Sequence, residues 1–103
     1  MSSPEAEASA NAPGAVTRVM KIVNEKGLHA RASAKFVQTV EKFDATVRVS
    51  RNEESVGGDS IMGLMMLAAG IGTSITVTAI GPEAQEVIAA LDALVSTRFG
   101  EDE

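Results

Sequence analysis

Residues 27–36 read GLHARASAKF, and they set the only histidine of the chain, His29, just before a predicted helix. Apolar residues then recur at helical spacing as far as Phe43, which predicts a helix over about residues 30 to 42. The start of a helix offers free backbone N–H groups and the positive end of the helix dipole, and both favour a bound anion. We therefore expect the surroundings of His29 to suit an anion.

His29 and Arg31 together suit the acceptance of a phosphoryl group. Near neutral pH a useful fraction of histidine is unprotonated and nucleophilic without an activating partner. Arg31, two residues further on, adds a planar and permanently charged donor for phosphate oxygens. Considered alone, a histidine in such a loop is more often a solvated surface residue than a nucleophile, and Arg31 could be a solvated cation of the first helical turn. The residue chemistry by itself leaves both interpretations open.

The rest of the chain predicts one folded domain between two tails. Residues 1–15 are rich in Ser, Ala, Glu, Pro and Gly, and we expect a disordered N-terminal tail there. Residues 16–23 are β-rich and predict a first strand, which a polar loop joins to the helix at His29. The domain is expected to cover residues 16–99, followed by an acidic C-terminal tail at 100–103.

The second half of the domain predicts a hairpin, a short helix, a strand and a last helix. Residues 46–56 alternate polar and apolar around a polar turn, which is typical of a hairpin. Asp59 is the expected N-cap of a short helix that runs to about Leu67. A strand is predicted over about residues 75–79, and Pro82 opens the last helix, which carries a continuous apolar face.

The predicted order of elements is therefore β-α-β-β-α-β-α. Strands that alternate between polar and apolar residues imply a sheet with one buried and one solvated face, so the helices should cover one side only. The fold class we expect is α+β, an open-faced β-sandwich with a four-stranded antiparallel sheet and three helices on one face. The spacing of the elements alone would fit a ferredoxin-like domain nearly as well.

Composition and charge exclude several classes of function. With 103 residues, of which 45% are hydrophobic, the chain suits a single small domain, and its lack of cysteine excludes disulfides and thiolate sites. A net charge of −5 argues against binding to nucleic acid. No apolar run suits membrane insertion and no signal peptide is recognisable, so a cytoplasmic location is expected. One histidine and scattered carboxylates predict no metal site, and we expect no cofactor.

Two segments resemble the motifs of a known family. GLHAR, residues 27–31, closely resembles the active-site segment of HPr, the histidine-containing phosphocarrier of the bacterial phosphotransferase system. DSIMGLM, residues 59–65, resembles the regulatory-serine segment of that family and follows at about the family's separation. The resemblance covers about residues 16 to 99. It implies the open-faced β-sandwich fold and a phosphoryl carrier, not an enzyme with turnover of its own.

The resemblance also implies roles for His29 and Arg31. His29 would accept a phosphoryl group on Nδ1, as pros-phosphohistidine, from enzyme I that phosphoenolpyruvate has charged. It would then pass the group to the A-domain of an enzyme II or to a related regulatory protein. Arg31 would stabilise the phosphate, and any magnesium would belong to enzyme I. We expect the carrier to be a monomer.

Ser60 is the candidate for regulatory phosphorylation, because family members in many bacteria are modified at the matching serine by HPr kinase/phosphorylase. A phosphate would find N–H donors and a favourable dipole at the start of the short helix. Ser60 could equally do no more than help to cap that helix. Asp59 beside it would repel a phosphate modestly.

Partner binding is expected on two further segments. The short helix carries more apolar residues than one face can bury, and Ile61, Met62 and Met65 match the docking patch of the family. Gly27 most simply supplies a turn, which would also let a partner approach His29 closely. Asn24 matches a loop position of the family, although it could be a turn residue only.

One departure from the family pattern is visible. Ala32 stands where the family usually has proline, and it gives up the fixed φ that proline would bring to the first turn. We therefore expect a looser geometry around His29.

One alternative function is an HPr-like regulatory protein that acts through Ser60 phosphorylation and protein contacts, with little histidine transfer.

Two other functions are further from the observations. A small-molecule-binding domain of ferredoxin-like topology would require both motifs to be coincidental. A serine hydrolase is disfavoured because the chain has no nucleophile elbow and His29 has no evident acid partner.

Overall fold

The computed structural model describes residues 14–101, and the element order confirms the prediction from sequence. Most of the predicted N-terminal tail and the last two residues lie outside the described range. A single 3₁₀ turn, η1, follows the last helix. The elements are β1 (Val16–Lys21), α2 (Ala30–Val40), β2 (Thr46–Arg51), β3 (Glu54–Gly57), α3 (Ile61–Met66), β4 (Ser74–Ile80), α4 (Ala84–Ser96) and η1 (Arg98–Gly100).

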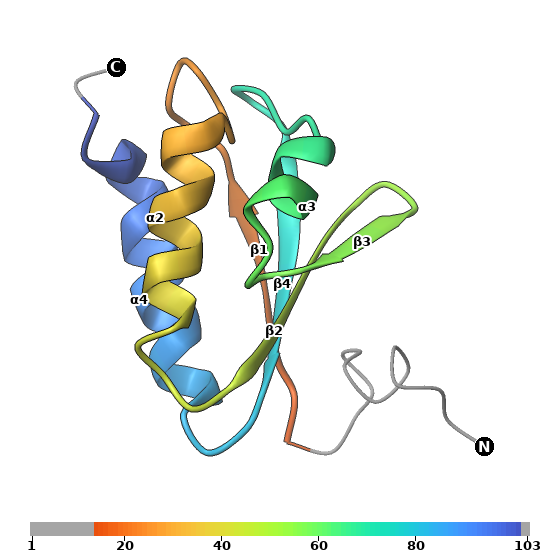
Figure 1. Ribbon diagram of the computed structural model, residues 1–103, viewed down its shortest axis with the longest axis vertical. Helices are drawn as coiled ribbons and strands as arrows, with labels where there is room; N and C mark the ends of the chain where they lie inside the picture. Colours follow the sequence, from red (N-terminus) through yellow and green to blue (C-terminus); the bar gives the residue numbers. More distant parts are fainter. Residues whose placement is uncertain (1–13, 102–103) are drawn as a thin grey trace.

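The four strands form one antiparallel sheet in the order β1-β4-β2-β3. Met20 of β1 lies opposite Ile75 of β4, and Val47 of β2 lies opposite Ala79 of the same strand. The three helices cover one face of the sheet, with α2 and α4 side by side and α3 near β3 (Figure 1). This is the predicted open-faced β-sandwich.

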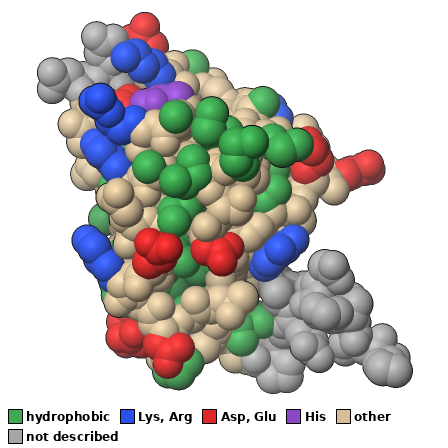
Figure 2. Space-filling view, in the orientation of Figure 1, with side chains coloured by type: hydrophobic (Ala, Val, Ile, Leu, Met, Phe, Trp, Pro, Cys, Tyr) green, Lys and Arg blue, Asp and Glu red, His purple; other side chains and the backbone are tan. Residues whose placement is uncertain are grey.

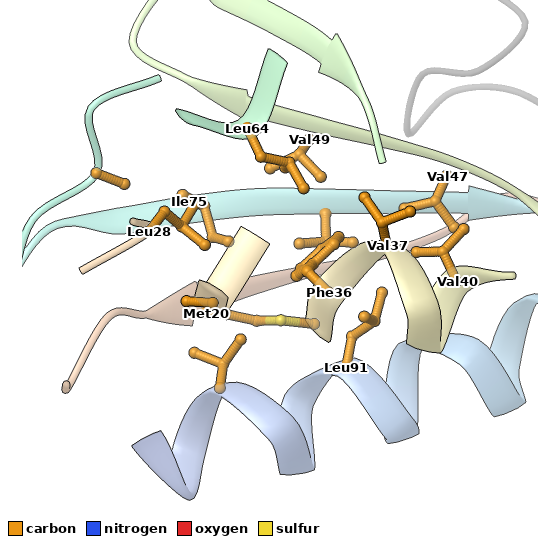
Figure 3. Packing of buried hydrophobic residues seen from close by; sticks show 14 of the residues in the cluster. Met20, Leu28, Phe36, Val37, Val40, Val47, Val49, Leu64, Ile75 and Leu91 are labelled. Atoms are coloured by element: carbon orange, nitrogen blue, oxygen red, sulfur yellow. The ribbon is translucent and has the colours of Figure 1, made fainter. Parts of the chain in front are cut away.

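The core lies between the sheet and the helices. Phe36 of α2 packs near Met20 of β1 and Leu91 of α4 (Figure 3), and Phe36 and Leu91 are wholly buried. Burial of a side chain of this size contributes about 1.5–3 kcal/mol relative to exposure. Such packing fixes α2 against the sheet, so the N-terminus of α2 has a defined position at one end of the molecule.

The boundaries of two helices differ from those predicted. Helix α2 ends at Val40, because Lys42 and Phe43 donate to carbonyls three residues back and close the last turn more tightly. The predicted N-cap of α3 is wrong. Ser60 caps this helix, with its Oγ accepting from the Gly63 N–H at 3.0 Å, whereas Asp59 precedes it and is exposed.

Over residues 14–101, no helix is both long enough and apolar enough to span a bilayer. No group of three or more His, Asp or Glu side chains in this range could hold a metal ion.

Candidate functional site

The loop between β1 and α2 requires glycine at position 27. Gly27 has a φ of +66°, in the left-handed region. A Cβ atom there would lie 2.5 Å from the carbonyl oxygen of Ala69 in the loop between α3 and β4. The next residue, Leu28, donates its N–H to that same oxygen at 3.0 Å. The close approach joins the two loops, and it brings the start of α2 near α3.

His29 is the N-cap of α2, as the sequence predicts for a residue at the helix start. Its backbone is extended, with φ −75° and ψ −177°, and its carbonyl oxygen accepts from the Ser33 N–H at 2.9 Å. Nδ1 of the imidazole accepts from the Arg31 N–H at 3.3 Å. The Nδ1 edge of the ring therefore faces the first turn of the helix, where backbone donors and the positive dipole end are found.

The Nε2 edge of His29 faces the carboxylate of Glu101. Nε2 and Glu101 Oε2 are 2.6 Å apart, and the His29 side chain is 28% exposed. The expectation that His29 has no acid partner is therefore wrong. Glu101 was assigned to the acidic tail, and it lies 72 residues further along the chain than the histidine that it contacts.

Asn24 connects the loop before α2 to the same carboxylate. Its Nδ2 donates to Glu101 Oε1 at 3.1 Å and to the Gly27 carbonyl oxygen at 2.9 Å. The Asn24 side chain is fully buried, and its Oδ1 has no hydrogen-bond partner among the described residues. Asn24 and the likewise buried Gly27 thus shape the loop from inside, with little surface for direct contact with a partner.

Opposing effects act on the pKa of the Glu101 carboxyl. Partial burial acts to raise this pKa, but hydrogen bonds from His29 and Asn24 lower it, as does electrostatic attraction by His29 and Lys26. The lowering effects prevail, so the pKa lies below the usual value for glutamate. Glu101 is consequently ionised at neutral pH.

Residues 98–101, which we call the C-terminal hook, carry Glu101 to His29. Arg98, Phe99 and Gly100 all have φ between +55° and +75°, so the chain turns sharply after α4. The Phe99 side chain is completely buried, and its carbonyl oxygen accepts from Lys35 Nζ of α2 at 2.6 Å. A buried ring and a charged hydrogen bond therefore fasten the hook to the fold.

An open pocket of about 620 Å³ surrounds the imidazole, and we call it the His29 pocket. Its lining includes the cations Lys26, Arg31 and Lys35 together with Glu101. Figure 2 shows the histidine with basic side chains on one side and a group of hydrophobic side chains on the other. The basic side is chemically suited to an anion such as phosphate.

The hydrophobic group belongs in part to α3. The exposed hydrophobic residues of α3, which we call the methionine patch, have 40–70% of their surface accessible. Leu64 and Leu67 of the same segment are buried. The patch contains the three predicted docking residues and one more. It consists of Ile61, Met62, Met65 and Met66.

The family model described as "PTS HPr component phosphorylation site" matches residues 16–97. The phosphocarrier protein HPr of Cupriavidus necator is 54% identical over 82 residues, which are 80% of this chain and 92% of that protein. The phosphocarrier protein HPr of Neisseria meningitidis serogroup A is 49% identical over 84 residues, 82% of this chain and 94% of that protein.

Solved structures of HPr proteins have the same fold. HPr-C-His from Thermoanaerobacter tengcongensis superposes with a TM-score of 0.82 at 38% identity, over 85% of this chain and 99% of that one. HPr from Bacillus anthracis gives a TM-score of 0.75 at 38% identity, over 79% of this chain and 96% of that one. An HPr dimer from Thermoanaerobacter tengcongensis gives a TM-score of 0.67 at 40% identity, over 80% of this chain and 94% of that one.

Proposed function

The chain belongs to the HPr family of phosphocarrier proteins, and we propose that it carries its phosphoryl group on Nδ1 of His29. The observation that supports this most directly is the position of the ring at the N-cap of α2, with Nδ1 beside the Arg31 N–H. A phosphoryl group on Nδ1 would meet the backbone donors of the first turn and the positive end of the helix dipole.

Each transfer exchanges one bond to phosphorus for another. The Nδ1 lone pair attacks the phosphorus of phosphorylated enzyme I, a bond to Nδ1 forms, and the bond to the donor breaks. In the second transfer an enzyme II A-domain or a related regulatory protein takes the group from Nδ1. The carrier must release what it binds, so moderate stabilisation of the phosphate suits it better than a tight grip.

Arg31 is the residue that we propose to stabilise the phosphate. Its side chain is exposed and lines the His29 pocket, with Lys26 and Lys35 nearby. A guanidinium presents several donors to phosphate oxygens, and at an exposed position it contributes without holding the group too tightly. No cofactor or metal of the carrier itself enters this scheme.

Partners are proposed to dock on the methionine patch. Ile61, Met62 and Met65 are exposed on α3, which packs against α2, and flexible thioether side chains can adapt to enzyme I and to an acceptor in turn. We propose that Gly27 and Asn24 assist docking indirectly, by fixing the loop before His29. A monomer in the cytoplasm completes this proposal. Its folded domain, predicted from sequence over residues 16–99, continues through the C-terminal hook to Glu101.

A second function, regulatory phosphorylation of Ser60, is supported by the position of this residue. Ser60 is partly exposed and lies directly before the methionine patch. A phosphate there, added by a partner such as HPr kinase/phosphorylase, would bring negative charge to the border of the docking surface. In the alternative, the chain acts through phosphorylated Ser60 and transfers little through His29. A single measurement distinguishes this alternative from the main proposal.

That measurement is intact mass after incubation with enzyme I, magnesium and phosphoenolpyruvate. We expect the wild-type chain to gain one phosphoryl group, and mild acid to remove it, because phosphohistidine is acid-labile and phosphoserine is not. The His29→Ala variant, shown by circular dichroism to be folded, should gain nothing. If the folded wild type gains no group from several enzymes I, the main proposal is wrong and the Ser60 alternative is favoured.

A further inference from the structure

The contact between His29 and Glu101 determines where the imidazole proton lies. An ionised carboxylate accepts hydrogen bonds and cannot donate one. The 2.6 Å contact with Glu101 Oε2 therefore requires the proton on Nε2. The other nitrogen, Nδ1, accepts from the Arg31 N–H and so carries the lone pair. Both contacts favour the same tautomer.

We propose that Glu101 is a positioning residue, which keeps a proton on Nε2 of His29 throughout the transfer cycle so that Nδ1 takes and releases the phosphoryl group. The inference rests on the proposed function, because it concerns how His29 acts as the carrier. Glu101 touches neither phosphorus nor donor, and it acts through the ring alone.

The balance of the two transfers shows why this proton matters. When neutral imidazole attacks through Nδ1, the product is a phosphorylated ring that still holds its proton on Nε2. When the bond between phosphorus and Nδ1 breaks, the electron pair returns to Nδ1, and the leaving group is neutral imidazole. Had the Nε2 proton been lost, the leaving group would be an imidazolate anion, which leaves less readily. With Glu101 in place, neither step moves a proton.

The C-terminal hook is built to present this carboxylate. Phe99 is wholly buried, and Lys35 holds its carbonyl oxygen at 2.6 Å. Three successive left-handed residues then turn the chain toward the loop before α2. Asn24, which is also fully buried, holds the second carboxylate oxygen at 3.1 Å and leaves Oε2 for the imidazole. Three contacts and the left-handed turn thus favour one orientation of the Glu101 side chain.

The charges around the pocket make a carboxylate compatible with a visiting phosphate. Lys26, Arg31 and Lys35 line the same pocket, and Glu101 is the one acidic residue in the lining that the structure describes. The carboxylate contacts the Nε2 edge of the ring, whereas the Nδ1 edge faces the N-terminus of α2. The acid and the phosphoryl group therefore occupy different edges of the imidazole.

The test compares the full-length wild type with Glu101→Gln, Glu101→Ala and the control Glu41→Gln. Glu41 is an exposed carboxylate at the opposite end of α2, so its substitution makes the same change of charge away from His29. The first measurement is ¹⁵N–¹H NMR of the imidazole in the unphosphorylated protein. We expect a low-field Nε2–H signal in the wild type and the control, a shifted signal in Glu101→Gln, and loss of the signal to exchange in Glu101→Ala.

The second measurement is the rate of transfer from the phosphorylated carrier to an acceptor domain. We expect Glu101→Ala to be about tenfold slower than the wild type, since removal of the partner that orients a functional histidine has effects of this order. The deficit should widen as the pH is raised above neutral, and Glu101→Gln should recover part of the rate. A role in folding alone would not produce that pH profile.

Specific results would overturn the inference. It is wrong if the wild-type ring carries its proton on Nδ1, if Glu101→Ala keeps the wild-type ring signals, or if its transfer rate equals that of Glu41→Gln at every pH. Should Glu101→Ala fail to fold, the comparison of Glu101→Gln with Glu41→Gln decides in the same way. If the wild type accepts no phosphoryl group, the proposed function fails instead, and the ring signals still report on the tautomer.

Discussion

The N-termini of α2 and α3 are capped in the same manner but lie in different surroundings. His29 caps α2 by accepting from the Arg31 N–H at 3.3 Å, and Ser60 caps α3 by accepting from the Gly63 N–H at 3.0 Å. The cap of α2 lies among basic residues and a carboxylate, whereas that of α3 follows an exposed aspartate and precedes exposed apolar side chains. A cap alone therefore does not define an anion site. The side chains around it do.

Of the changes that test this comparison, removal of the Arg31 guanidinium at the start of α2 should have the largest effect on phosphoryl transfer. We expect Arg31→Ala to slow phosphoryl transfer to His29 about tenfold, because a hydrogen bond to a charged group contributes about 1.5–3 kcal/mol and exposure places this one at the lower end. The measurement is the initial rate with enzyme I. Arg48→Ala, which removes a charge from β2, is the matched control, and equal rates for the two variants would show that the basic surroundings do not matter.

The next effect concerns the apolar surroundings of the α3 terminus. Met62 is 70% exposed in the methionine patch, and Val19 on β1 is 64% exposed. We expect Met62→Ser to raise the KM for enzyme I about fivefold, which corresponds to about 1 kcal/mol of docking energy. Val19→Ser removes comparable apolar surface from another part of the molecule, and its KM should be that of the wild type. If both variants shift KM alike, the docking surface is not confined to α3.

A smaller effect should separate the two roles of Ser60. We expect Ser60→Ala to lower the free energy of unfolding by about 1 kcal/mol, the usual contribution of an N-cap, whereas Ser60→Asp should keep the cap. Asp59→Ala should stay within about 0.5 kcal/mol of the wild type, since it precedes the helix. Urea denaturation measures all three. A larger loss for Asp59→Ala than for Ser60→Ala would restore the N-cap predicted from sequence.

The smallest effect should be a difference in local opening at the start of α2. With alanine in place of the family's usual proline at position 32, we expect the amides of residues 30–33 to exchange faster than those in the middle of the helix. Hydrogen exchange followed by NMR measures this. Exchange at residues 30–33 as slow as in the middle of α2 would show that the buried methyl group of Ala32 holds the terminus as firmly as a proline ring would.

The sequence was sufficient to predict the fold because its signals are local. Strand alternation and helical periodicity locate every element of residues 14–101 except the short η1 turn, and the run around Gly27 places His29 at a helix start. Two adjacent residues that are both good caps, Asp59 and Ser60, could not be ranked, since the choice depends on where the backbone turns into the helix.

The part of the site that sequence reasoning missed depends on distant contacts. Glu101 meets His29 across 72 positions, and no local period reports such a pairing. The two non-glycine residues with positive φ that begin the hook, Arg98 and Phe99, carry no turn signal of the kind that Gly27 does. The acidic composition of the last residues predicted a solvated tail. In the structure, the buried ring of Phe99 and the contact of its carbonyl oxygen with Lys35 show that the chain is still anchored just before Glu101.

The position of the C-terminal hook matters for anyone who modifies this protein. Glu101, which contacts the imidazole, is followed by only two residues in the sequence, so an affinity tag or a fluorescent fusion at the C-terminus could crowd the entry of a phosphoryl donor. The start of β1 lies at the other end of the sheet from the N-terminus of α2 (Figure 1). We therefore expect attachment on the side that precedes β1 to interfere less with the approach to His29, and immobilisation for binding assays is best made there.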